Sequence, residues 1–214
     1  IRAACLTKDI DRVIVSTDSE KYAAIAKDYG AEIPFLRPKE ISRDNSTDLD
    51  YIHHTLNWLQ THEGAIPRLL VHLRPTTPLR QPQVIREAIK AIESNSEATA
   101  LRSIHEMSES AYKCFETDGK YLTCLCSRSR DIDTKSLARQ LFPKTYEPNS
   151  YVDILKTNFI LKTGKIHGDK AIAFHSPRVI DIDNQEDFDI VGFQVMQKKS
   201  LIDSYFHSHK PVSP

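Results

Sequence analysis

The chain has 214 residues, of which 40% are hydrophobic, and its 29 lysines and arginines balance 29 aspartates and glutamates. This length and apolar content suit one sizeable α/β domain with an additional lobe. Balanced charge argues against a nucleic-acid module that depends on overall positive charge, and hydrophobic runs of only strand length argue against a membrane span. Four cysteines without a C-x-x-C or disulfide-rich spacing favour a reducing cytoplasm.

The first six residues, Ile1 to Leu6, read as a helix already under way, without a methionine or a capping residue. We therefore expect that the N-terminal part of a larger protein precedes them. The lack of a signal peptide then gives no information on targeting.

Residues 1–104 alternate between short β-branched runs and segments with apolar residues at helical spacing. The expected strands lie at residues 12–18, 32–36 and 69–73, and the expected helices at 20–29, 47–62 and 84–92. Gly30 follows the first helix at a position that suits a helix end. This alternation predicts a doubly wound, mostly parallel sheet with helices on both faces.

The rhythm changes near residue 105, where shorter pieces surround the hairpin signal Asp118-Gly119. We expect a lobe at residues 105–148, inserted into a discontinuous core of residues 1–104 and 149–201. In the second half of the core, strands are expected at residues 151–155, 171–174 and 179–182, followed by a closing helix. Residues 202–214, which include His207 and His209, are expected to form a tail.

Ligands bind beyond the carboxyl ends of strands in open parallel sheets, and four polar groups of residues follow the expected strands. They are Ser16-Thr17-Asp18, Arg37 with Ser46 and Thr47, the segment from Arg74 to Arg80, and Asp181 with Asp183. Each has a plain alternative, since hydroxyls and carboxylates cap helices and prolines end strands. Together they offer the hydroxyls, guanidiniums and paired carboxylates that a triphosphate with Mg²⁺ requires.

The pair Asp181 and Asp183 follows an apolar run, and residues i and i+2 of a strand project from the same face. The same tripeptide, Asp-Ile-Asp, occurs at Asp131 to Asp133, after a polar stretch with no strand to orient it. We interpret the second copy as surface charge paired with nearby arginines, and the first as a metal and phosphate site.

These motifs, in this order, resemble those of the acylneuraminate cytidylyltransferases. The resemblance covers residues 1–198 and rests on residues 13–20, 35–40, 44–47, 73–80 and 180–188, and on Arg139-Gln140, Pro143, Tyr146, Pro148 and Asn149. It implies a Rossmann-like α/β core with an inserted dimerisation lobe, a homodimer, CTP as donor and Mg²⁺ as cofactor. The acceptor it implies is a nine-carbon keto sugar acid.

The resemblance also implies roles for single residues. Asp181 and Asp183 would be the catalytic, metal-binding pair. The implied nucleotide-binding residues are Ser16, Thr17, Asp18, Arg37, Ser46, Thr47 and Thr76. The implied substrate-binding residues are Arg74, Arg80, Lys113, Arg139, Asn149 and Asp153, with Lys113 and Arg139 approaching the sugar carboxylate across the dimer.

The chain departs from the family pattern in two respects. The glycine-rich, basic phosphate loop and its strand are missing before Ile1, so this chain alone should bind CTP poorly. Arg74 replaces the usual glutamine, Ser150 replaces the glycine after Asn149, and Asp153 stands in a strand. These changes near the sugar favour a legionaminic or pseudaminic acid as substrate. The Gln-Gly-Asp-Glu-Pro segment of the related Kdo cytidylyltransferases is not found.

The hypothesis is therefore cytidylyl transfer, in which the anomeric hydroxyl of the keto sugar attacks the α-phosphate of CTP and pyrophosphate leaves. No separate general base is identified. Two alternatives remain: a non-catalytic dimerisation or regulatory module that has lost phosphate binding, and a nucleotidyltransferase for another sugar acid or a sugar phosphate.

Overall fold

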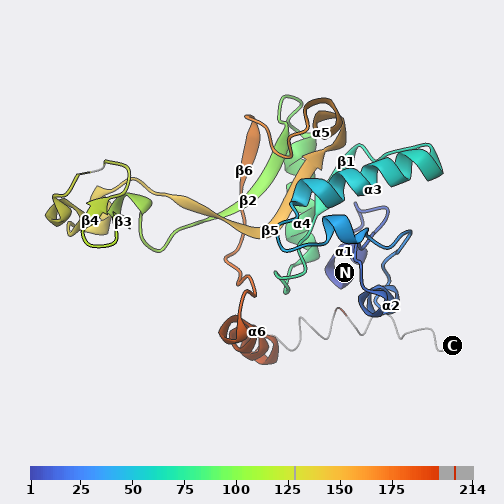
Figure 1. Cartoon of the computed structure of the whole chain (residues 1–214), viewed down its shortest axis with the longest axis horizontal. Helices are drawn as coiled ribbons and strands as arrows, with labels where there is room; N and C mark the ends of the chain where they lie inside the picture. Colours follow the sequence, from blue (N-terminus) through green and yellow to red (C-terminus); the bar gives the residue numbers. More distant parts are fainter. Residues whose placement is uncertain (128, 198–204, 206–214) are drawn as a thin grey trace.

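The computed structural model describes residues 1–127, 129–197 and 205, and its core is a four-stranded sheet with the order β1-β5-β2-β6 (Figure 1). The strands are β1 (Leu69–His72), β2 (Ala100–Glu106), β5 (Tyr146–Lys156) and β6 (Ala171–His175). β2 pairs in parallel with β6, whereas β5 is antiparallel to both β1 and β2. Three of the four strands thus run in one direction, but β5 makes two of the three neighbouring pairs antiparallel, so the predicted α/β class is confirmed with a mixed sheet that contains one parallel pair.

Three predicted strands are not formed as strands. The backbones of residues 12–18 and 32–36 pair only in an isolated parallel bridge between Ile14 and Glu32. A cleft of about 1460 Å³ lies between residues 13–18 and β1, and among the described residues neither backbone has a partner on the cleft side. Residues 179–182 likewise make one backbone contact, from the Ile182 N–H to the Thr76 carbonyl. The strand prediction is wrong for these segments, because a strand also needs a neighbour to pair with.

Six helices are present in the described part of the chain. They are α1 (Arg2–Cys5), α2 (Glu20–Asp28), α3 (Asp48–Glu63), α4 (Pro82–Glu93), α5 (Thr157–Thr163) and α6 (Gln185–Gln197). Local sequence explains the start and the end of α3. Thr47 and Asp50 form a reciprocal capping box at its start, and Gly64 ends it with φ +70°. None of these helices is long and apolar enough to cross a membrane.

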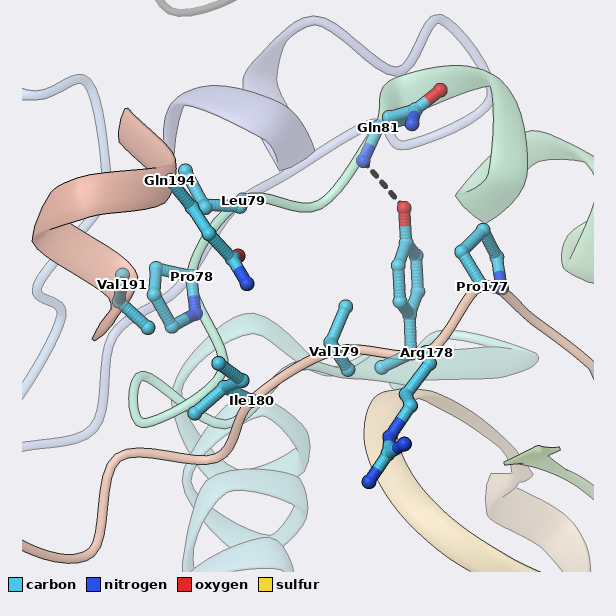
Figure 2. A pocket seen from close by; sticks show the side chains of 10 residues that line it. Pro78, Leu79, Gln81, Pro177, Arg178, Val179, Ile180, Val191 and Gln194 are labelled. Atoms are coloured by element: carbon cyan, nitrogen blue, oxygen red, sulfur yellow. Dashed lines mark hydrogen bonds between the residues drawn. The ribbon is translucent and has the colours of Figure 1, made fainter. Parts of the chain in front are cut away.

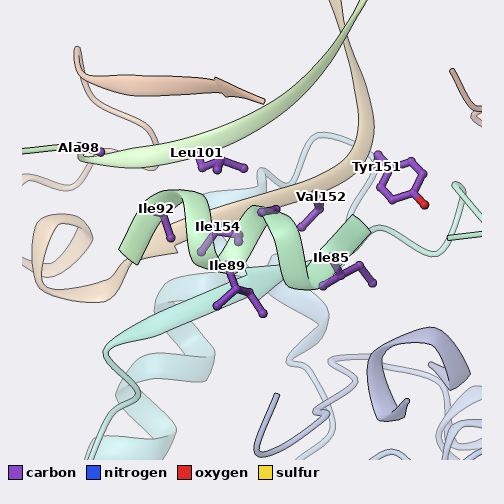
Figure 3. Packing of buried hydrophobic residues seen from close by; sticks show 9 residues of the cluster. Ile85, Ile89, Ile92, Ala98, Leu101, Tyr151, Val152 and Ile154 are labelled. Atoms are coloured by element: carbon purple, nitrogen blue, oxygen red, sulfur yellow. The ribbon is translucent and has the colours of Figure 1, made fainter. Parts of the chain in front are cut away.

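Two apolar clusters place helices on both faces of the sheet, as the alternation predicts. On one face, Ile85, Ile89 and Ile92 of α4 pack against the sheet residues Leu101, Val152 and Ile154 (Figure 3). On the other, Ile52 and Leu56 of α3 pack against Ala100, Leu155 and Ile160. Ile154 and Leu155, which are adjacent in β5, thus belong to the apolar clusters on opposite faces of the sheet. Each fully buried valine, leucine or isoleucine stabilises the fold by about 1.5–3 kcal/mol.

The chain between β2 and β5 forms a lobe away from the core, because these two strands continue outward as a ribbon (Figure 1). Its hairpin pairs β3 (Phe115–Thr117) with β4 (Leu122–Cys124), which confirms the Asp118-Gly119 turn signal. Short 3₁₀ turns lie at Lys39–Ile41 before the lobe and at Ala111–Lys113, Ile132–Lys135 and Arg139–Leu141 within it. The exact division at residues 105 and 148 stays a prediction, and the predicted tail lies outside the described residues except for Tyr205.

Candidate active site

Two segments that follow parallel strands meet at one edge of the sheet. The loop at residues 74–80 follows β1, and the segment with Asp181 follows β6. The Ile182 N–H donates to the Thr76 carbonyl at 2.9 Å, and the Thr77 hydroxyl donates to the Asp181 carboxylate at 3.3 Å. Because Thr77 is fully buried, its side chain is held in place, and its hydroxyl in turn holds the Asp181 carboxylate. The structure therefore brings together two groups that the sequence analysis placed at the same edge.

Apolar packing supports this junction. A small pocket of about 30 Å³ is lined by Pro78 and Leu79 together with Val179, Ile180 and the α6 residue Val191 (Figure 2). The backbone that carries Asp181 thus lies near the loop at residues 74–80 and the middle of α6. Position in the fold, and not strand pairing, places Asp181 here, whereas the side chain of Asp183 is exposed.

Arg80, predicted to bind substrate, directs its guanidinium at the backbone. Its N–H groups donate to the carbonyl oxygens of Tyr151 at 2.5 Å, Arg74 at 2.7 Å and Ser150 at 2.8 Å, and also to that of Thr77. Burial lowers its pKa to about 10, so it is still charged at neutral pH. Arg80 therefore fixes the loop at residues 74–80 to β5, and its role in substrate binding stays a prediction.

Arg74 is held between two carboxylates. It forms a hydrogen bond with Asp48, at the start of α3, and another with Asp153 of β5 at 3.2 Å. Burial would raise the pKa of Asp48, but hydrogen bonds from Tyr51 and Arg74 outweigh it and keep that pKa below its ordinary value. The Tyr51 hydroxyl also lies 2.6 Å from Nε2 of His72. Arg74 is thus a fixed cation whose charge is matched by its neighbours.

The predicted nucleotide-binding residues divide into two groups. Ser16, Thr17, Asp18 and Arg37 line the large cleft, and the Arg37 N–H donates to the Thr17 carbonyl at 2.8 Å. Ser46 and Thr47 have local roles instead, because the Ser46 hydroxyl accepts from the Arg43 N–H and the Thr47 hydroxyl caps α3. Thr76 is exposed beside the Asp181 segment.

Of the remaining predicted substrate residues, Asn149 lies beside this edge, whereas Lys113 and Arg139 lie apart from it. Asn149 is buried and ties β5 to the chain after β6, donating to Ser176 and to the Pro177 carbonyl. Lys113 and Arg139 belong to the lobe, far from the sheet edge of the same chain (Figure 1). Lys113 pairs with Glu109 at 3.4 Å, and Arg139 donates to the Ser108 carbonyl and pairs with Glu106.

The repeated tripeptide in the lobe has the surface position that the sequence analysis predicted. Asp131 and Asp133 are exposed. Of the two nearby arginines, Arg130 pairs instead with Asp118 at 3.1 Å, and Arg128 lies outside the described residues, so the predicted pairing with arginines stays a prediction for Arg128.

The carboxylates at the sheet edge fit a cation that is shared with a substrate. Among the described residues, no three His, Cys, Asp or Glu side chains gather closely enough to hold a metal by themselves. Mg²⁺ is commonly bound by one or two carboxylates together with substrate phosphates and water. A pair such as Asp181 and Asp183 therefore suits Mg²⁺ that arrives with a nucleotide, and not a permanent structural metal.

Sequence reasoning missed three polar side chains that organise this edge: Thr77, Asp48 and Tyr51. Thr77 lay inside a recognised motif, but only its burial distinguishes it from Thr76. Asp48 and Tyr51 looked like ordinary residues of the first turns of α3. Their contacts with Arg74 and His72 span more than 20 residues, so no local pattern could show them.

Solved structures identify the class to which this fold belongs. A CMP:2-keto-3-deoxy-manno-octonic acid synthetase, solved with CTP, superposes with a TM-score of 0.59 at 11% identity, covering 92% of this chain and 85% of that one. A 4-diphosphocytidyl-2C-methyl-D-erythritol synthase from Anaerococcus prevotii gives a TM-score of 0.57 at 13% identity, with 91% and 82% covered. This chain therefore shares its α/β fold with these two proteins.

A family model described as cytidylyltransferase matches residues 1–188, so the chain belongs to that family of nucleotidyltransferases. It is 28% identical to an N-acylneuraminate cytidylyltransferase of Escherichia coli O18:K1:H7, with all of this chain and 49% of the relative covered. It is 25% identical to a CMP-N,N'-diacetyllegionaminic acid synthase of Campylobacter jejuni, with 90% and 80% covered. The chain thus spans about half of the first relative and four-fifths of the second.

Proposed function

We propose that the complete protein transfers a cytidylyl group from CTP to a sialic-acid-like nonulosonic acid, giving the CMP-sugar acid and pyrophosphate. The observation that carries this proposal is the contact between Thr77 and Asp181, which joins the loop after β1 to the carboxylate segment after β6. Family membership supports the nucleotide, and the names of the relatives support the acceptor class.

In the proposed reaction, the anomeric hydroxyl oxygen of the sugar acid forms a bond to the α-phosphorus of CTP. The bond from that phosphorus to the β-phosphate bridging oxygen breaks, and the hydroxyl proton is lost to solvent or phosphate. Asp181 and Asp183 would hold Mg²⁺, which neutralises phosphate charge. Thr77 keeps Asp181 in place, and Arg80 keeps the loop at residues 74–80 rigid, so positioning accounts for much of the catalysis.

The large cleft supports the proposed binding of CTP. It is bounded by the free edge of β1 and by the segment around Ile14, whose only backbone partner lies on its other side. Such a cleft has room for one further parallel strand, whose carboxyl end would deliver a phosphate-binding loop beside Thr17 and Arg37. Without that strand, CTP binding is expected to be weak.

The lobe supports a homodimer. Exposed apolar side chains gather on it, notably Phe115, Tyr121, Leu122 and Leu141, which is 69% exposed. Burying such a surface against a second copy would stabilise a dimer. Lys113 and Arg139 would then reach the partner's site.

A substrate panel tests the proposal directly. Pyrophosphate release by the complete protein would be measured with CTP, Mg²⁺ and either N-acetylneuraminic, legionaminic or pseudaminic acid, or a sugar 1-phosphate. Release with one or more of the nonulosonic acids is expected, with legionaminic or pseudaminic acid preferred because of Arg74 and Asp153. Release with sugar phosphates alone would support the alternative nucleotidyltransferase, and none at all would favour a non-catalytic module.

A further inference from the structure

The segment that carries Asp181 and Asp183 connects β6 to α6 and belongs to neither element. Residues two apart share a face in a strand, but residues 179–182 pair with no strand in the described part of the chain. A sheet therefore does not set how the two carboxylates stand relative to each other. Two carboxylates can share one cation only if other contacts fix the backbone that carries them.

Contacts with the loop at residues 74–80 fix the first part of this backbone. The Thr77 hydroxyl donates to the Asp181 carboxylate at 3.3 Å, and the Ile182 N–H donates to the Thr76 carbonyl at 2.9 Å. Both contacts come from the same loop and reach no further than Ile182. The exposed residue Asp183 needs a contact from another element.

The first turn of α6 supplies that contact. The Asp183 N–H donates to Oδ2 of Asp187 at 3.1 Å. Asp187 is held in turn, because its own N–H donates to the side chain of Asn184 at 3.0 Å. The Phe188 N–H donates to the Asn184 carbonyl at 3.2 Å, which makes Asn184 the residue that caps α6. The successive N–H groups of Ile182 and Asp183 are thus held by a loop and by a helix.

A comparison with α3 shows what is unusual at α6. Asp50 is the third residue of α3, as Asp187 is of α6. The Asp50 carboxylate accepts from the N–H of the capping residue itself, Thr47, at 2.7 Å, as in an ordinary capping box. The Asp187 carboxylate instead accepts from the residue before the capping residue. Starting a helix requires only the α3 arrangement, whereas the α6 arrangement fixes Asp183.

We propose that Asp187 is a positioning residue, which holds Asp183 in the orientation that binds the metal ion of the reaction. This inference rests on the proposed function and adds a residue to its site. Carboxylates that bind metals are commonly held by hydrogen-bonded partners, and loss of such a partner typically costs 10- to 100-fold in metal affinity or activity. Thr77 would hold one carboxylate of the pair from the loop, and Asp187 would hold the other from the helix.

Substitution by asparagine separates positioning from direct binding of the metal. Asp187→Asn keeps an oxygen that accepts from the Asp183 N–H but removes the negative charge. Asp187→Ala removes both. A positioning residue should therefore tolerate asparagine, whereas a third metal-binding carboxylate should not.

The first test measures binding of Mn²⁺, a paramagnetic substitute for Mg²⁺, to the complete protein in the presence of CTP. By electron paramagnetic resonance, Asp187→Ala should bind Mn²⁺ about 10-fold more weakly than the wild type, and Asp187→Asn less than about threefold more weakly. Asp189→Ala is the matched control. Asp189 is an exposed aspartate of the same helix that accepts from the Gln185 side chain at 2.8 Å, and its loss should change Mn²⁺ binding less than about twofold.

The second test needs neither metal nor activity. Hydrogen exchange of single amides in the metal-free complete protein would be followed by NMR. In Asp187→Ala the Asp183 amide should exchange about 10-fold faster, because a hydrogen bond to a charged group is lost. The Ile182 amide should keep its rate, because its partner is the Thr76 carbonyl.

Unchanged Mn²⁺ binding by Asp187→Ala, or an unchanged exchange rate of the Asp183 amide, would overturn the inference. Equal losses of Mn²⁺ affinity in Asp187→Asn and Asp187→Ala would also overturn it, since the charge and not the position would then matter. A wild type that binds Mn²⁺ with CTP but transfers no cytidylyl group would overturn the proposed function alone. A wild type that binds no Mn²⁺ would overturn the metal site and the role of Asp187 with it.

Discussion

The tripeptide Asp-Ile-Asp occurs twice in this chain, and its two copies lie in opposite surroundings. Asp181 begins the copy at the sheet edge, where a buried threonine holds it against the loop at residues 74–80. Asp131 begins the copy in the lobe, where both carboxylates are exposed. Identical side chains at identical spacing thus differ in how well they suit a metal or phosphate site. Only the copy at Asp181 has fixed neighbours from distant parts of the chain.

The largest expected difference between the copies is catalytic. Asp181→Asn should reduce kcat for cytidylyl transfer about 100- to 1000-fold, since a carboxylate on catalytic Mg²⁺ contributes several kcal/mol. Asp131→Asn, the same change in the lobe, should leave kcat within about twofold. Steady-state rates at saturating Mg²⁺ would compare them, and near-normal turnover by Asp181→Asn would reject the proposed site.

Arginines in the two regions should differ in their effect on stability. Arg80→Ala leaves four backbone carbonyls without their donor, so we expect a loss of about 3–5 kcal/mol in the free energy of unfolding. Arg130→Ala removes an exposed ion pair with Asp118 and should cost less than about 1 kcal/mol.

Denaturant unfolding would measure both values, and Arg80→Lys sharpens the comparison. A lysine retains the charge but lacks the planar fork, so most of the loss should persist. Wild-type stability of Arg80→Lys would mean that charge alone matters at this position.

The two regions should also lose stability in different pH ranges. Burial, aided by Arg74, lowers the pKa of His72 to about 4, so the folded core holds this histidine neutral. The stability that depends on a neutral His72 is fully present above the unfolded pKa of about 6.5. As the pH falls towards 4, the free energy of unfolding decreases by up to about 3 kcal/mol. Backbone hydrogen bonds from Tyr121 and Lys120 lower the pKa of Asp118 in the lobe, so that contribution disappears only below about pH 3.8.

Fluorescence of Trp58, the single tryptophan, reports unfolding of the core, and the amide signal of Gly119 reports the lobe. The core should weaken first on acidification, and His72→Gln should flatten its pH dependence between about 6.5 and 4. A lobe that weakens first, or an unchanged pH profile of His72→Gln, would contradict this assignment.

The smallest expected effects concern left-handed backbone positions. Ser150 has φ +55° without being glycine, so Ser150→Gly should stabilise the protein by about 0.5–1 kcal/mol. Gly119 in the lobe has φ +96° with open space around it, so Gly119→Ala should destabilise by about 1 kcal/mol through backbone strain alone. Unfolding midpoints would give both signs, and destabilisation by Ser150→Gly would mean that its hydroxyl outweighs the strain.

Sequence reasoning succeeded where local chemistry determines the structure. The span of α3, the apolar stripe of α4 and the Asp118-Gly119 hairpin all depend on residues close in sequence. It failed where a segment needs a distant partner: residues 12–18 look like a strand but face a cleft, and residues 179–182 contact a loop. The same limit explains Arg80, because a sequence does not reveal whether a guanidinium meets a ligand or backbone carbonyls.

Phosphorus NMR of the complete protein, with CTP, Mg²⁺ and the preferred nonulosonic acid, tests the central claim most directly. Cytidylyl transfer to an anomeric hydroxyl creates one new phosphodiester signal together with pyrophosphate, and both should be absent with Asp181→Asn and retained with Asp131→Asn. A diphosphate-diester signal from a sugar phosphate, or unchanged CTP with every sugar acid, would contradict the account.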